Sequence, residues 1–240
     1  MPPIQGVLFD AMNTLIYPHP PVFAVYREAA LRQGVDLSIE LIGDRFRPAF
    51  RGEEERDRLH DLSTSEGREI RRWRDLVAAA LPELPDPERG YRELWDHFSQ
   101  PEYWRCYEDV EPTLRELDAR GVPWGIASNF DSRLRMIVAS LAEFASREAT
   151  LAISSEIGWK KPHAMFFQEA ARRLGVEPNR ILFAGDDWVN DVVGAREAGM
   201  QVCFLDRRRN ADFEIRSDGQ NVPTVRDLRE ILPFADASRP

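Results

Sequence analysis

Five short apolar runs, most of them separated by helical stretches, constrain the fold of this chain most. The runs span residues 6–9, 123–127, 151–154, 181–184 and 201–205. Helical periodicity is found before or between the later runs, at residues 111–120, 132–141, 162–174 and 190–198. Short and almost wholly apolar runs are typical of strands buried on both faces. The alternation therefore predicts an α/β fold, with a parallel sheet covered by helices on both sides.

The long interval between the first two runs predicts an inserted all-α subdomain. Apolar residues recur there at three-to-four spacing, in the stretches 21–34, 38–57, 65–81 and 86–99. We expect an α/β core of residues 1–16 and 106–240 and a helical cap of residues 17–105. Trp73, Trp95 and Trp104 are expected to be packing residues of this cap and not a cofactor site.

Charge and composition exclude several function classes. The 240 residues are 43% hydrophobic, and the formal net charge of −9 disfavours nucleic acid or an anionic membrane as a partner. No run approaches the ~18 apolar residues of a membrane span, and no secretory signal is evident. Two distant cysteines fit a reducing cytoplasm. We expect the arginines at 207–209 to lie on a solvated loop and residues 234–240 to be frayed.

Polar residues follow each of the first four runs. Singly, each has a structural explanation, such as capping a turn or a helix. Because the carboxyl ends of parallel strands meet at one edge of a sheet, where ligands collect, we expect these side chains to converge. They are Asp10, Asn13 and Thr14 after the first run, Ser128 and Asn129 after the second, Lys161 after the third, and Asp186, Asp187 and Asp191 after the fourth.

The use of lysine supports this interpretation. Of 32 lysines and arginines, only Lys160 and Lys161 are lysines, which suggests a position where a compact ammonium is needed. Lys161 is assigned to the predicted site, and Lys160 is expected to lie on the surface.

The convergent set is typical of attack by a carboxylate on phosphorus or carbon. Crowded carboxylates need a cation, and hard oxygen ligands select Mg²⁺. A lysine and a hydroxyl suit the phosphoryl oxygens, on which charge is spread in the transition state. An aspartyl-phosphate would form and then be hydrolysed.

Four segments, "FDAMNTL", "IASNFD", "KKP" and "AGDDWVNDVVGAREAGM", resemble the four motifs of the haloacid dehalogenase-like superfamily, in order and at normal spacing. The insertion after the first motif is similar to the helical C1-type cap of that superfamily. Further similarity, in "SNFDSRL" and "SEIGWKKP", indicates the branch of the domain-containing-3 proteins. The resemblance implies a Rossmann-like core and a small anionic substrate, either a phosphorylated metabolite or a haloacid.

The same resemblance implies a role for each motif residue. Asp10 would be the nucleophile and a Mg²⁺ ligand, together with the backbone carbonyl of Met12 and with Asp186. Lys161 would neutralise the transferred group, and Asp191 would support the metal or Lys161. Asp187 would join the metal shell or cap a helix. The substrate-binding set would be Asn13, Thr14, Ser128 and Asn129, with Thr14 also holding Asp10 in place.

Met12 departs from the pattern of the family phosphatases, which have an aspartate there that protonates the leaving group and then activates water. Three interpretations remain open. The first is a Mg²⁺-dependent phosphohydrolase that has no such acid–base residue, or that uses Glu53, Glu54 or His60 of the cap in its place. The second is a metal-free 2-haloacid dehalogenase, ranked lower because Asp186 is acidic. The third is a weak or inactive scaffold that binds phosphate and metal. A phosphonate hydrolase is set aside, since the cap has no lysine.

Overall fold

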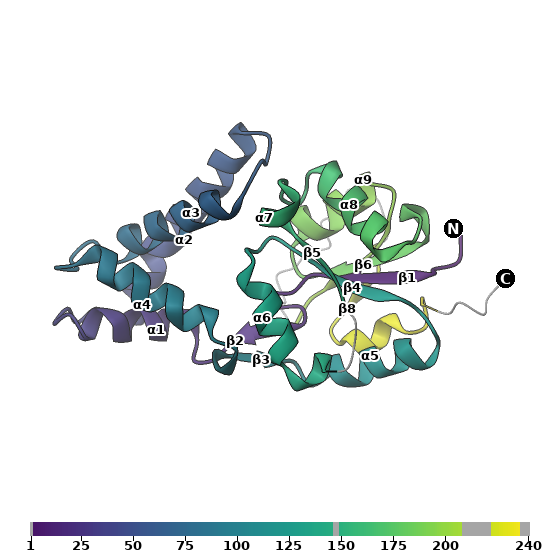
Figure 1. The fold of residues 1–240 in the computed structure, drawn as a ribbon, viewed down its shortest axis with the longest axis horizontal. Coiled ribbons are helices and arrows are strands. Elements are labelled where there is room, and N and C mark those ends of the chain that lie inside the picture. The colour runs from purple at the N-terminus through teal and green to yellow at the C-terminus, as the bar shows by residue number, and fades with distance from the viewer. Residues whose placement is uncertain (1, 146–148, 208–221, 236–240) are drawn as a thin grey trace.

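A six-stranded parallel sheet forms the centre of the molecule (Figure 1). The computed structural model describes residues 2–145, 149–207 and 222–235. The strand order is β5-β4-β1-β6-β7-β8. The strands are β1 (Gly6–Phe9), β4 (Trp124–Ser128), β5 (Thr150–Ile153), β6 (Ile181–Gly185), β7 (Gln201–Leu205) and β8 (Thr224–Val225). The five predicted strands are confirmed to within one residue, whereas the two-residue β8 carried no detectable pattern.

Helices cover both faces of the sheet, as predicted. Val7 and Phe9 of β1 belong to the apolar cluster of one face, which includes residues of α5 (Val110–Ala119) and α6 (Arg133–Ser140). Leu8 belongs to the opposite cluster, with α8 (Ala164–Leu174). Successive residues of a strand point to opposite faces, so a strand covered on both sides must be apolar throughout. Figure 1 shows α8 and α9 (Gly194–Glu197) on one side and α5 and α6 on the other.

One predicted helix differs in form. The stretch predicted at residues 190–198 begins with a π-helix, Trp188–Val193, and continues as α9. A short helix α7 (Ser154–Ile157) follows β5 directly. Three short 3₁₀ turns, Ala142–Phe144, Pro178–Arg180 and Leu228–Ile231, complete the core.

Four helices between β2 (Ile16–Pro18) and β3 (Trp104–Cys106) form a separate group beside the sheet (Figure 1). They are α1 (Val22–Leu31), α2 (Ile39–Leu59), α3 (Glu66–Ala80) and α4 (Pro87–Ser99), close to the predicted stretches. These helices share an apolar cluster of their own. The chain enters and leaves them through an antiparallel pair, β2 and β3, with a 3₁₀ turn at Pro101–Tyr103. The division at residues 17 and 105 remains a prediction.

The turn between α2 and α3 contacts the core directly. Ser63 and Trp159 form an antiparallel bridge. On either side of it, Thr64 N donates to Gly158 O over 2.9 Å and Lys160 N donates to Leu62 O over 2.9 Å. These backbone hydrogen bonds hold one end of the helical group against the loop that carries Lys161.

The structure bears on two predictions, the solvated loop at residues 207–209 and the frayed tail at residues 234–240. Arg207 is not on a solvated loop: its guanidinium pairs with buried Asp109 at 2.8 Å and also donates to Thr14 O at 2.8 Å. Residues 208 and 209 lie outside the described residues, as do 236–240 of the tail, whereas Ala235 is fully buried. None of the helices in the described ranges has the length and apolar character needed to cross a bilayer.

Candidate active site

A cavity of about 1150 Å³ lies between the carboxyl edge of the sheet and the helical group. The structure brings almost all predicted site residues to it. Its polar lining includes Asp10, Asn13, Ser128, Asn129, Lys161, Asp186, Asp187 and Asp191, together with Met12. Thr14 is the exception, because it is fully buried and does not line the cavity.

Lys161 joins two of the carboxylates. Its ammonium donates to Asp10 Oδ1 at 2.6 Å, to Asp191 Oδ1 at 2.7 Å and to Ala127 O at 3.0 Å. Lys161 is 2% exposed, so this cation has left water almost completely. Burial opposes its charge, but the contacts with Asp10 and Asp191 outweigh that effect and raise the pKa of Lys161. Lys161 therefore stays protonated at any physiological pH.

The carboxylates of Asp10, Asp186 and Asp191 form a compact group. One oxygen of each lies within 4.8 Å of the others. Complete burial and the charge of Asp10 raise the pKa of Asp191, against the lowering effect of Lys161. One lysine thus leaves this group short of positive charge. Three hard oxygen donors at this separation fit Mg²⁺, and such an ion would supply the missing charge.

Asn129 holds the lysine in position through its backbone. The side-chain amide accepts from Lys161 N at 2.7 Å and donates to Lys161 O at 3.0 Å. Asn129 thus lines the cavity, and both ends of its side-chain amide are bonded to the Lys161 backbone. Ser128, 2% exposed, lines the cavity, and within the described ranges its hydroxyl has no hydrogen-bond partner. Ser128 therefore offers a donor to a bound anion.

Two acids of the fourth motif have local roles. Asp187 Oδ1 accepts from the backbone N–H groups of Val189 and Asn190, each at 2.9 Å, so Asp187 caps the π-helix. Thr14 Oγ1 donates to Asp186 Oδ1 over 3.4 Å and so orients Asp186. The expected contact between Thr14 and Asp10 is not among the hydrogen bonds of the described residues.

Gly185 permits the close approach of β6 to Asp191. A Cβ atom at residue 185 would overlap the Asp191 carboxylate. Only a residue without a side chain lets the end of β6 pass this group. The glycine of the "AGDD" segment is thus required by packing at the site.

The expectation that Lys160 lies on the surface is wrong. Lys160 is 6% exposed, and its ammonium donates to Asp57 Oδ2 of α2 at 3.0 Å and to Glu69 Oε1 of α3 at 3.2 Å. Asp57 also pairs with Arg68 at 2.7 Å and with Arg72 at 2.5 Å. Burial opposes ionisation of Asp57, but Lys160 and Arg72 lower its pKa. The two adjacent lysines thus point to different partners, one in the core and one in the helical group.

The sequence offered Glu53, Glu54 and His60 of the helical group as alternatives and did not select one of them. Glu54 of α2 lines the cavity, whereas Glu53 and His60 do not. Of the six cap arginines at positions 45, 47, 51, 71, 72 and 74, Arg72 alone is buried and the rest are solvated as expected or partly so. Trp73 and Trp95 pack against the apolar cluster of the helical group, as predicted, whereas Trp104 is buried in the cluster of the core. All three also line the cavity.

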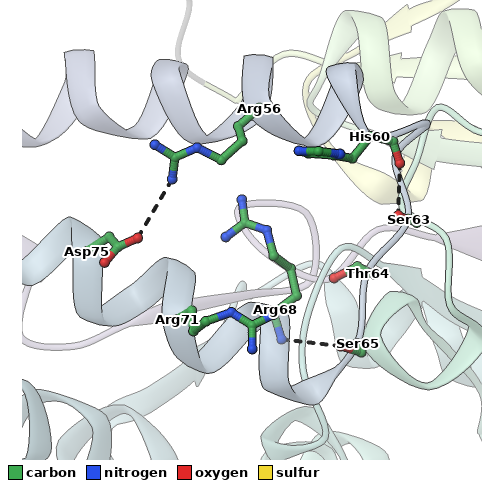
Figure 2. A pocket seen from close by; sticks show the side chains of 8 residues that line it. All are labelled: Arg56, His60, Ser63, Thr64, Ser65, Arg68, Arg71 and Asp75. Carbon is green, nitrogen blue, oxygen red and sulfur yellow. Dashed lines mark hydrogen bonds and ion pairs between the residues drawn. The ribbon is translucent and has the colours of Figure 1, made fainter.

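A second hollow, of about 420 Å³, lies at the α2–α3 turn and is lined by basic residues (Figure 2). Figure 2 shows Arg56 directed at Asp75, with His60 near the turn. Arg56 also pairs with Glu53, and Arg68 pairs with Glu53 and Asp57. Carboxylates already neutralise Arg56 and Arg68, and Arg71 is exposed to solvent, so we assign no ligand to this hollow.

Comparison with known proteins identifies the family. A model of the haloacid dehalogenase-like hydrolases matches residues 4–199. Haloacid dehalogenase-like hydrolase domain-containing protein 3 of Mus musculus is 28% identical over 234 residues, which cover 95% of this chain and 92% of that protein. Glyceraldehyde 3-phosphate phosphatase of Methanopyrus kandleri is 31% identical over 225 residues, which cover 92% and 91%.

Solved structures have the same fold. The crystal structure of a dehalogenase with an intermediate complex superposes with a TM-score of 0.74 at 20% identity, covering 99% of this chain and 100% of that one. The family match spans most of the chain, and the similarity to the domain-containing-3 proteins confirms the predicted branch. The chain therefore belongs to the haloacid dehalogenase-like hydrolase family and is a hydrolase.

Proposed function

We propose that the protein is a Mg²⁺-dependent phosphohydrolase that forms an aspartyl-phosphate on Asp10. The observation that carries this proposal is the pairing of Lys161 with Asp10 and Asp191, beside the third carboxylate of Asp186. A dianionic phosphate would add negative charge to a site already crowded with carboxylates, so its binding would require Mg²⁺ beside Lys161. We further propose that the enzyme works in the reducing cytoplasm.

The proposed reaction has two steps. An oxygen of Asp10 attacks phosphorus, and the bond from phosphorus to the leaving-group oxygen breaks. Water then attacks the phosphorus of the aspartyl-phosphate, and inorganic phosphate and the Asp10 carboxylate are released. The Ser128 hydroxyl donates to one phosphoryl oxygen, and the Lys161 ammonium donates to another by giving up one of its three present contacts. Charge develops on these oxygens in both steps. Mg²⁺, held by Asp10, Asp186, Asp191 and the Met12 carbonyl, would reduce repulsion between Asp10 and the phosphate and polarise the phosphoryl group.

Met12 places one condition on this chemistry. A thioether neither donates nor accepts a proton, so the side chain at this position gives no general acid–base help. Such help is typically worth about 10²–10⁴-fold in rate. The proposed enzyme therefore needs either a good leaving group or a proton donor from another part of the chain.

The proposal competes with a dehalogenase and with a non-catalytic scaffold, and one set of assays separates them. We expect turnover of p-nitrophenyl phosphate or acetyl phosphate that is lost when EDTA removes Mg²⁺ and returns when the ion is added back. Halide release from 2-chloropropionate that is indifferent to EDTA would instead establish the dehalogenase. Tight Mg²⁺-dependent binding of fluoroberyllate without any turnover would establish the scaffold.

The aromatic lining of the cavity supports a substrate with an apolar body. The side of the cavity formed by the helical group is mostly apolar, and its aromatic residues include Phe23, Phe46, Phe50, Trp73, Trp95 and Phe98. Burying an aromatic ring here is worth about 1.5–3 kcal/mol, or roughly 10–150-fold in affinity. We therefore propose a phosphate monoester whose alcohol is apolar or aromatic.

We expect KM for naphthyl phosphate to lie at least about tenfold below KM for glycerol phosphate, because only the aryl ester buries a ring. Phe23→Ala should raise KM for the aryl ester and leave that for glycerol phosphate unchanged. Steady-state kinetics with the two esters measures both effects. Equal KM values in the unaltered enzyme would contradict the assignment of an apolar recess.

A further inference from the structure

The proposed reaction lacks a proton donor at Met12, and the structure narrows the three candidates named from the sequence to one. Glu69 of α3 also lines the cavity, but its carboxylate already accepts from Thr64 Oγ1 and Lys160 Nζ. Glu53 is 5% exposed, pairs with Arg56 and Arg68, and does not line the cavity. His60 lines the outer hollow of Figure 2. Glu54 lines the same cavity as Asp10 and Met12. Glu54 is thus the one of the three acids and bases whose side chain reaches the cavity.

The phase of α2 explains why Glu54 faces the cavity. Phe46, Phe50 and Glu54 are spaced by four residues and therefore lie on one face of the helix. All three line the cavity, so this face of α2 is its wall. Glu54 is the single acid on a stripe that is otherwise aromatic.

The neighbours of Glu54 place it at the catalytic end of that wall. Asp57, about 4.5 Å further along the axis of α2, binds Lys160. The next residue, Lys161, binds Asp10. Phe46 and Phe50 lie further along α2 from the contact between Asp57 and Lys160. The chain of contacts brings Glu54 toward the reacting groups and leaves the aromatic residues for the body of the substrate.

The surroundings of Glu54 favour a protonated carboxyl. Glu54 is half-buried, and within the described part of the chain its carboxyl has no hydrogen bond or ion pair. Burial raises its pKa most, and Asp187 raises it further from the core side. Arg72 of α3, Arg58 of its own helix and Lys160 of the core loop lower the pKa without cancelling the rise. Both cations that face it from other elements are already paired with Asp57.

We propose that Glu54 supplies the acid–base function that Met12 lacks; this inference rests on the proposed function. As the bond from phosphorus to the leaving oxygen breaks, the Glu54 carboxyl gives its proton to that oxygen. Glu54, now a carboxylate, takes a proton from the water that attacks the aspartyl-phosphate. After phosphate leaves, Asp10 is again a carboxylate and Glu54 is again protonated, so the cycle needs no other co-reactant.

The test is the dependence of Glu54→Gln on the leaving group. For an alkyl phosphate, whose alkoxide needs a proton, kcat/KM should fall about 10²–10⁴-fold. For p-nitrophenyl phosphate kcat/KM should fall far less, because nitrophenolate leaves without a proton. In the same variant the aspartyl-phosphate should accumulate, seen as a burst of nitrophenolate before slow turnover. In the unaltered enzyme, activity on the alkyl phosphate should fall as pH rises through the pKa of Glu54. In E54Q this fall should be absent from the pH–rate profile.

Two further variants make the result specific. Glu55→Gln changes the exposed neighbour on the same helix and should leave all rates unchanged. Met12→Asp in the E54Q background should restore part of the alkyl phosphate activity, since it returns an acid to the cavity. Equal losses for both esters in E54Q, or no loss, would contradict the role of Glu54 and leave the proposed function standing. Absence of Mg²⁺-dependent turnover of any phosphate by the unaltered protein would overturn the proposed function and this inference with it.

Discussion

Asp10→Asn should abolish turnover, with a loss on the order of 10⁴-fold or more, because an amide oxygen is too weak a nucleophile to form the phosphoryl bond. The substitution is nearly isosteric, and Lys161 keeps Asp191 as a partner at 2.7 Å, so the fold should survive. Steady-state kinetics and a thermal melt measure the two effects. A variant that retains more than about a tenth of the activity would show that Asp10 is not the nucleophile.

A single turnover in ¹⁸O-labelled water extends this experiment to the kind of intermediate. Water that attacks phosphorus puts the label into the released phosphate and leaves Asp10 unlabelled. Water that attacks the carbonyl carbon of an aspartyl ester, as in dehalogenation, puts the label into Asp10. Mass spectrometry of the peptide that contains Asp10 separates the two outcomes. We expect an unlabelled Asp10.

Lys161→Met should have the second largest effect, on both stability and activity. The variant leaves the carboxylates of Asp10 and Asp191 buried together without their cation. Removing one partner of a buried ion pair typically costs about 3–5 kcal/mol, which we expect in the free energy of unfolding at neutral pH without Mg²⁺. Turnover should be lost as well, since the phosphoryl oxygens lose a donor. Urea unfolding and a phosphatase assay provide the measurements.

The pH dependence of this loss has a definite sign. In the unaltered protein, the pKa of Lys161 is raised, so its contribution is complete at neutral pH and is lost only at strongly alkaline pH. In the variant, Asp191 loses the lysine that lowers its pKa, so the pKa of this buried carboxyl rises further above its unfolded value. Such a group costs no stability below about pH 4, where it is protonated in both states, and destabilises the folded state as pH rises. The deficit should therefore shrink as pH falls toward about 4, and saturating Mg²⁺ should also reduce it at neutral pH.

Lys160→Met is the matched control. Lys160 is equally buried, but its partner Asp57 keeps Arg68 and Arg72 after the substitution. The loss of stability should therefore be smaller than in Lys161→Met, and turnover should be retained in part. Equal effects of the two variants would contradict the distinct roles of the adjacent lysines.

The strands of the core could be predicted closely because they are buried on both faces. Both faces of a segment such as 181–184 are buried, so all its consecutive residues must be apolar, and this run can be recognised in the sequence. The carboxyl-edge rule then placed Asp10, Lys161 and Asp186 at one edge, and the cavity indeed collects them. By contrast, β2, β3 and β8 have two or three residues each, too few for a period to be recognised.

The sequence by itself determined the α/β core, the four helices of the insertion and the set of polar residues at the sheet edge, because local periodicity and strand ends carry that information. Only the tertiary structure decided which side chains of the insertion meet that edge. Lys160 is next to Lys161 in sequence, yet it is buried by Asp57 and Glu69, which lie about a hundred residues away. Glu53 and Glu54 are likewise adjacent and similar in sequence, but the phase and docking of α2 bring one of them alone to the cavity. Contacts between distant segments depend on how helices pack, and no local pattern records that packing.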